Sequence, residues 1–260
     1  MMSVAKHIKP YGIIIYGDFV DFYKLSFHSK DPSRKSSIKA ELTEAKEHLD
    51  ELDTLGAKEK KYVMGNHEYR LERYIWEKCP EFDGLIPSVE EYLGLKERGW
   101  DVIQYKKYGK QGHFRYTHDV GVAGQFAHYK AAQAFQTSNG TGHTHRAGVH
   151  YFGTVEGDSK ISVMFGWGGD KEAADYANET QKKDWMLSFG VSYENQADKC
   201  HHVQVIPLIN YTAVVNGKLF EAPFTKSTVS QPIKTMDQLL EKQRAINRAE
   251  TKRLATRKKH

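Results

Sequence analysis

Side chains that bind divalent metals occur at four places in the chain, and each place follows a short run typical of a β-strand. The groups are Asp18 and Asp21, then Asn66, His67 and Glu68, then His118, and finally His143 and His145. A single histidine is more often a surface or core residue than a metal ligand, and two aspartates alone would also fit a turn. Carboxylate, amide and imidazole donors at successive strand ends together favour a metal centre.

These donors need strands that bring them to one edge of a sheet. The run 12–16 is short, apolar and β-branched without alternation, which predicts a buried strand. Asp18 follows it at the carboxyl edge, where open α/β sheets build their sites. Apolar residues at helical spacing over 38–52 then predict an amphipathic helix. The same order of strand and helix recurs over 60–76 and again over 113–135, where the helix is expected from about Ala123, so the first half of the chain is expected to consist of βα units.

The second half of the chain has a different pattern. Apolar and polar residues alternate over 160–168, 201–210 and 212–224, which predicts antiparallel strands. Asn216-Gly217 is typical of a tight hairpin turn. From about Thr235 the chain is rich in helix formers, and a helical tail is expected there.

Length suits one α/β domain, or at most two small ones, and we expect one over residues 1–234, followed by a basic helical tail over 235–260. Of the 260 residues 39% are hydrophobic, which is enough for a core. No run approaches the roughly 18 apolar residues of a membrane span, and no signal-peptide core is present, so no membrane partner is expected. Cys79 and Cys200 lack CxxC spacing, which favours a reducing compartment and predicts a cytoplasmic location.

The positive charge is concentrated at the end of the chain. The formal net charge is +5, and residues 241–260 contain eight Lys or Arg against two Glu, so the rest is close to neutral. This tail could bind the phosphate backbone of a nucleic acid or could simply be solvated. The basic loop 28–37, with Lys30, Arg34 and Lys35, leaves a similar choice between steering of a polyanion and plain solvation.

The motifs GDFVD, GNHE, TH before a glycine-bearing loop, and GHTH occur in an order that resembles the calcineurin-like metallophosphoesterase superfamily. The resemblance covers residues 11 to about 215. The strand-rich later part, with WMLSFGV and VVNGKLFEAPF, is similar to phosphoesterases encoded by bacteriophages. The resemblance implies a four-layer α/β/β/α sandwich of two mixed sheets, with two divalent cations between the strand ends.

The resemblance also implies a role for each matching residue. Asp18 would bridge the two cations, Asn66, His118 and His143 would bind one of them, and His145 would bind the other. His67 would protonate the leaving group or stabilise the transition-state charge, and Asp21 would orient it. Arg70 either contacts phosphate oxygens or belongs to a solvated helix face. Mn²⁺ is the expected metal, with Zn²⁺, Fe and Ni²⁺ as alternatives.

The chain departs from the family pattern at its start. Family members begin with a strand that ends in Asp-x-His, whereas the first ten residues here contain no aspartate, and 3–9 is expected to be a helix. We therefore expect a chain that is N-terminally truncated relative to the family, with an incomplete second cation site and an uncovered sheet edge. His7 is a candidate replacement ligand, although a surface position is favoured. Phe22-Tyr23 replace the Arg-Gly of the protein phosphatases, which argues against a phosphoprotein substrate.

Two functions are consistent with these residues. The first is a metal-dependent phosphoesterase that hydrolyses phosphodiester bonds, including those of nucleic acid, or phosphomonoester bonds, through a metal-activated water. The second is a non-catalytic remnant or nucleic-acid-binding protein that retains the fold with an incomplete metal site.

Overall fold

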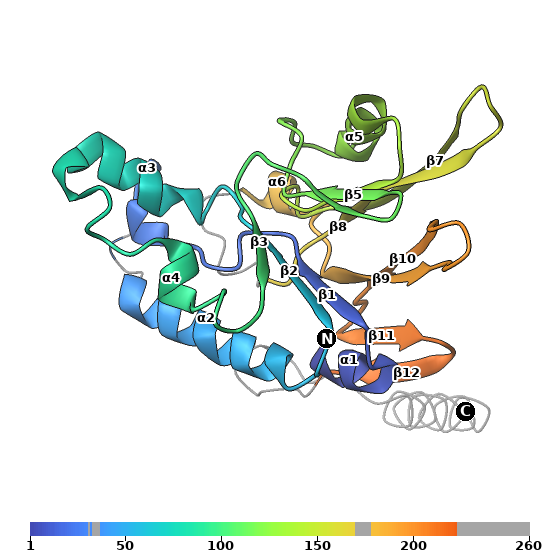
Figure 1. Ribbon diagram of the computed structural model, residues 1–260, viewed down its shortest axis with the longest axis horizontal. Helices are drawn as coiled ribbons and strands as arrows, with labels where there is room; N and C mark the ends of the chain where they lie inside the picture. Colours follow the sequence, from blue (N-terminus) through green and yellow to red (C-terminus); the bar gives the residue numbers. More distant parts are fainter. Residues whose placement is uncertain (31, 33–36, 170–177, 223–260) are drawn as a thin grey trace, which may run out of the picture. The chain divides into compact units, whose positions relative to one another are not determined.

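A computed structural model describes residues 1–30, 32, 37–169 and 178–222 (Figure 1). This part of the chain is a mixed α/β protein, and residues 1–221 form one compact unit. The expected tail from Thr235 lies outside the described residues, as do Arg34 and Lys35 of the basic loop. No described helix is long and apolar enough to cross a membrane.

The first sheet has three parallel strands in the order β1-β2-β3, which are Gly12–Ile15, Glu59–Val63 and Asp101–Ile103. β1 forms its edge, as expected from the sequence. Three helices cover one face, namely α2 (Ile38–Asp53), α3 (Tyr69–Lys78) and α4 (Val89–Leu93) (Figure 1). The predicted βα order is therefore confirmed for this half of the chain.

The two faces of the first sheet belong to two different cores. Ile13 and Ile15 of β1 pack with the helices, in a cluster that includes Leu49 of α2. Ile14 points the other way and packs with Val163 of the second sheet. Successive side chains of a strand lie on opposite faces, so this short apolar strand serves both cores and needs no polar face.

The second sheet has five strands in the order β4-β5-β6-β8-β7. They are Gly109–Gln111, Phe114–Thr117, Asn139–Thr141, Ser159–Phe165 and Ala147–Gly153, respectively. The central strands β5, β6 and β8 are parallel, and the outer pairs are antiparallel. Helix α5 (Ala127–Phe135) contacts β6, β7 and β8 (Figure 1).

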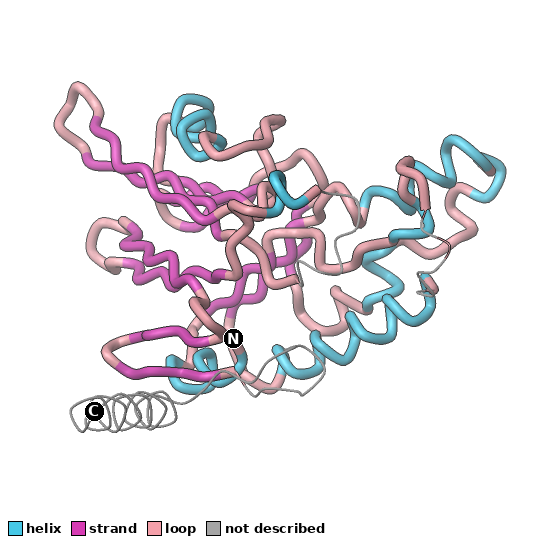
Figure 2. The backbone as a smooth tube through the Cα atoms, turned by 180° about the vertical axis from the view of Figure 1, so that it is seen from behind, coloured by secondary structure: helices cyan, strands magenta, loops and turns pink. Residues whose placement is uncertain are grey.

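Antiparallel pairs follow, as the alternating sequence predicts. β9 (Ser188–Glu194) pairs with β10 (His201–Pro207), and β11 (Thr212–Val215) pairs with β12 (Lys218–Glu221) (Figure 2). Asn216 and Gly217 both have positive φ, 50° and 75°, which matches the predicted tight turn. The remaining short elements are α1 (Met2–Ile8), η1 (Tyr23–Leu25), η2 (Pro80–Phe82) and α6 (Glu179–Lys182).

Candidate metal centre

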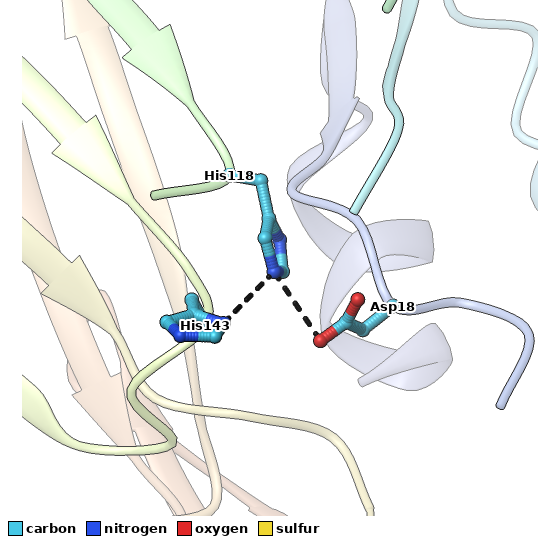
Figure 3. A group of neighbouring side chains, drawn as sticks. All are labelled: Asp18, His118 and His143. Atoms are coloured by element: carbon cyan, nitrogen blue, oxygen red, sulfur yellow. Dashed lines mark hydrogen bonds and ion pairs between the residues drawn. The ribbon is translucent and has the colours of Figure 1, made fainter. Parts of the chain in front are cut away.

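The predicted donor residues follow four strands at their carboxyl ends. Asp18 follows β1 and Asn66 follows β2 in the first sheet, while His118 follows β5 and His143 follows β6 in the second. Each pair of strands is parallel, so their carboxyl ends lie together. Figure 3 shows Asp18 and His143 on either side of His118, with all three side chains directed at a common point.

Four donor atoms converge at this point. Asn66 Oδ1 lies 3.0 Å from His118 Nε2 and 2.9 Å from His143 Nδ1, and these two ring nitrogens are 3.2 Å apart. Asp18 Oδ2 lies 3.3 Å from His118 Nε2 (Figure 3). Asp18, His118 and His143 therefore form a group that could hold a metal ion, with all ligand atoms within 4.8 Å of one another.

The orientation of His118 supports a ligand role. Its Nδ1 lies 2.6 Å from the carbonyl oxygen of Tyr16, an acceptor that requires a proton on Nδ1. In the neutral ring this leaves the lone pair of Nε2 directed at the donor atoms of Asp18 and Asn66. A second-layer hydrogen bond of this kind fixes the tautomer of metal-binding histidines in general.

Opposite charges hold Asp18 and His118 together. Burial opposes the charged form of Asp18, but the nearby His118 and His67 outweigh burial and hold its pKa well below its usual range. Burial also opposes protonation of His118, yet Asp18 raises the His118 pKa to about 9. Burial and the neighbouring His118 lower the pKa of His143. Asp18 and His118 thus form an ion pair beside a neutral His143, and a bound cation would replace the proton on His118.

The backbone is strained at the same place. Asp18, His143 and His145 all lie in the left-handed region, with φ of 54°, 62° and 58°. Residues other than glycine rarely adopt this backbone conformation. Those that do are often found at functional sites. Gly65 is required for a different reason, because a Cβ there would overlap the carboxylate of Asp18.

Glu68 was a candidate donor in the sequence, but the structure gives it a different role. Its side chain is 2% exposed, and the carboxylate accepts hydrogen bonds from the backbone N–H groups of Asp18, Phe19, Val20 and Gly65 and from the hydroxyl of Tyr62. These five donors use its acceptor capacity, so Glu68 ties the loop after β1 to the loop after β2.

His67 lies beside the donor group and is held by Asp21. His67 Nδ1 is 3.0 Å from Asp21 Oδ1, and its Nε2 is 3.7 Å from Asp18 Oδ2. Arg70 Nη1 donates to the backbone carbonyl of Asp21 at 2.7 Å and to its carboxylate at 3.0 Å. The Arg70 side chain is 12% exposed, so a solvated helix face is the wrong interpretation for this residue. The structure makes Arg70 a support for Asp21.

His145 lies outside the group of Asp18, His118 and His143. Its ring stacks on Trp167, with centroids 4.5 Å apart, and meets the edge of Trp185 at 4.4 Å. Burial lowers its pKa to about 4, so the ring is neutral. His7, the candidate replacement ligand, is exposed, which confirms the favoured surface position, and its ring centroid lies 5.4 Å from that of Phe220. Within the described residues, only the first group offers three such donors.

No protein-family model, curated protein or solved structure matches this chain. The functional interpretation therefore depends on the residues themselves and on their geometry.

Three aromatic residues near the candidate metal centre were not identified from the sequence. Tyr105 lies 6.4 Å from His118 between ring centroids, and burial together with Asp119 and Asp18 raises its pKa to about 12. Trp167 and Trp185 both contact His145, and their own ring centroids are 5.0 Å apart. None of the three lies next to a metal-type motif in the sequence, and only their tertiary contacts reveal them.

Proposed function

We propose that this chain is a metal-dependent phosphoesterase of the calcineurin-like type that acts on phosphodiesters. One observation carries the proposal: a carboxylate, an amide oxygen and two imidazoles from four separate strand ends converge on one point, with a fifth polar side chain, His67, beside them. Isolated capping or packing roles for these residues would give no reason for this convergence.

The donor set fits a divalent cation of the first transition row. Oxygen and imidazole donors without a thiolate favour Mn²⁺, with Zn²⁺, Fe and Ni²⁺ as alternatives. Such a cation, when bound, would polarise a phosphoryl oxygen and lower the pKa of a water molecule. Asp18 is ionised at neutral pH and needs to lose no proton before it binds. His118 is already oriented by Tyr16, so little ordering accompanies binding.

His67 is the residue that we assign to the leaving group. Asp21 accepts from its Nδ1, which directs Nε2 toward the donor group. From this position a protonated His67 can donate to the departing oxygen or stabilise its negative charge. Arg70 holds Asp21 through two contacts and so fixes the position of His67 indirectly.

We also propose the four-layer arrangement that the resemblance implies. In support of it, helices α2 to α4 pack on one face of the first sheet, and residues of the other face share a core with the second sheet. α5 in turn contacts three strands of the second sheet.

The second candidate function is a protein that binds one cation without turnover. The observation that favours it is the position of His145, which stacks on Trp167, makes a T-shaped contact with Trp185 and does not join the donor group. A single cation lacks the second charge that clamps a transferring phosphoryl group.

A hydrolysis assay separates the two functions. The purified full chain is incubated with bis(p-nitrophenyl) phosphate and Mn²⁺, beside the His143→Ala variant and a Lys46→Ala control on the exposed face of α2. The phosphoesterase proposal expects Mn²⁺-dependent release of nitrophenol that His143→Ala abolishes and Lys46→Ala preserves. Metal binding without any turnover, across Mn²⁺, Zn²⁺, Fe²⁺ and Ni²⁺, would favour the second candidate.

A further inference from the structure

A row of aromatic rings leads away from the candidate metal centre. Tyr105 lies 6.4 Å from His118, Tyr69 lies 5.2 Å from Tyr105, and Trp76 lies 6.1 Å from Tyr69, all between ring centroids. Tyr69 and Trp76 stand two turns apart on α3, so they share one side of that helix. We call Tyr69, Trp76, Tyr105 and Lys106 the aromatic strip.

Lys106 supplies a positive charge in this strip. Its ammonium lies 5.6 Å from the ring centroid of Tyr69 and 5.4 Å from that of Tyr105. It forms no ion pair with any carboxylate of the described residues, so the rings hold the charge without neutralising it. An exposed ammonium positioned in this way is available to an external anion.

The backbone of Lys106 is an unusual place for a lysine. The chain turns directly after β3, where the Lys107 N–H donates to the Gln104 carbonyl at 3.0 Å. Lys106 occupies the third position of this turn with φ of 65°, where glycine or asparagine is normally found. A strained residue near a functional site is a reason to look for a function in its side chain.

Trp76 is the most exposed ring of the strip. Tyr69 and Tyr105 are half-buried and have the Lys106 ammonium near their rings, whereas Trp76 is 48% exposed. The strip thus presents an ammonium near the metal centre and an indole farther along α3. The ammonium can bind a phosphate and the indole can stack on a nucleobase. A single-stranded nucleic acid offers both groups. In a duplex the bases are already stacked on one another, so the indole would have no partner.

We propose that the aromatic strip binds a single-stranded nucleic acid whose scissile phosphodiester lies at the metal centre. Lys106 binds a phosphate next to the scissile one, and Trp76 stacks on a base. The proposal rests on the proposed phosphoesterase function for its location, and it names the substrate class of that same site.

The strained turn provides a sharp test. Lys106→Gly removes the ammonium and also suits the positive φ, so this variant should fold at least as stably as the parent. Lys9→Gly is the matched control, because Lys9 is exposed and also has a positive φ, 53°. Lys9 ends α1, before β1 begins, and Asp18 lies beyond the end of β1, so the two variants lose the same charge at different places.

Binding is measured with a fluorescein-labelled deoxythymidine 12-mer by anisotropy, using the full chain in EDTA at low salt. Lys106→Gly should weaken binding about fivefold or more and reduce the log–log salt slope by roughly 0.7, one phosphate contact on a single strand. Trp76→Ala should weaken it about tenfold, within the range of one stacked base. Lys9→Gly should bind like the parent, and all three variants should melt no earlier than about 2 °C below it.

Several results would overturn the proposal: equal affinities for Lys106→Gly and the parent, equal losses for Lys106→Gly and Lys9→Gly, tighter binding of a matched duplex, or no binding by the parent. Because EDTA removes any metal, these readings do not depend on catalysis. If the proposed function is wrong, the chain will bind no metal or will not hydrolyse bis(p-nitrophenyl) phosphate. This outcome is independent of the affinity measured by anisotropy.

Discussion

The carboxylate of Glu68 accepts a hydrogen bond from the backbone N–H of Asp18 at 2.9 Å. The same carboxylate bonds the N–H of Gly65 at 2.8 Å. One buried side chain thus fixes the two loops that present Asp18 and Asn66, and the left-handed conformation of Asp18 is maintained by these contacts. The position of the candidate metal centre therefore depends on these two hydrogen bonds of Glu68 as much as on the metal-donor residues themselves.

Glu68→Gln should therefore destabilise the protein strongly. The NH₂ group of glutamine would face backbone N–H groups, which are also donors. At least two of these backbone N–H groups would then have no acceptor in the core. We expect the free energy of unfolding to fall by about 2–4 kcal/mol. Urea denaturation measures it, with Glu77→Gln on the exposed face of α3 as the matched control. A change below about 0.5 kcal/mol for Glu68→Gln would contradict this account of the two loops.

The stability of the metal-free protein should depend on pH in two opposite ways. His118 has its pKa raised to about 9, so its contribution is complete below about 6.5 and is lost as pH rises toward 9. His145 has its pKa lowered to about 4, so its contribution is complete above about 6.5 and is lost as pH falls toward 4. Stability should thus be highest near pH 6.5–7, with losses of about 1–3 kcal/mol on each side.

Urea unfolding in EDTA at pH 4.5, 6.5 and 8.5 checks this dependence. His118→Gln should flatten the alkaline limb, and His145→Phe, which keeps a ring in contact with both tryptophans, should flatten the acid limb. If the alkaline loss persists unchanged in His118→Gln, the ion pair with Asp18 is not its cause.

Asp21 should control the rate of hydrolysis and leave metal binding unchanged. Asp21→Asn no longer offers a carboxylate to the His67 Nδ1, so His67 loses the contact that fixes its orientation. We expect kcat to fall about 10- to 100-fold with one metal retained, and His67→Gln to lower kcat about 100-fold or more. Steady-state kinetics with metal analysis of the same samples tests both. Loss of the metal in Asp21→Asn would show that Asp21 supports the donor group itself.

The charge of residues 241–260 should affect nonspecific binding and leave the proposed metal centre unaffected. Removing them deletes a net charge of +6 and should lower the salt slope for nucleic acids by several phosphate contacts. Metal content and hydrolysis of bis(p-nitrophenyl) phosphate should stay the same, because all proposed ligands precede residue 146. An unchanged slope after truncation would place the nonspecific binding surface elsewhere on the chain.

The sequence predicted those parts of the fold that depend on local patterns. β1 ends before Gly17 and Asp18 because an apolar, β-branched run changes there to residues that turn the chain. α2 starts at Ile38 because Ser37 caps it, with its hydroxyl accepting from the Ala40 N–H at 3.1 Å. The donors that follow the strands come together because parallel strands share an edge.

Other features depend on contacts between distant residues. The sequence motif GNHE shows three polar side chains, but only the packing of Tyr62 and the loop after β1 determines that Glu68 points into the protein. The stacking of His145 depends on Trp167 and Trp185, which follow it far along the chain. The helix expected from about 123 begins at Ala127, after Gly121 and Gly124 with positive φ.

The most direct test of the central claim is metal analysis of the purified chain after equilibration with Mn²⁺ and removal of free metal. The geometry predicts close to one tightly bound ion per chain, because one group of donors converges within the described residues. His143→Ala should abolish retention and His145→Phe should preserve it. Full retention by His143→Ala, or loss in His145→Phe alone, would contradict the assignment of Asp18, His118 and His143 as the metal centre.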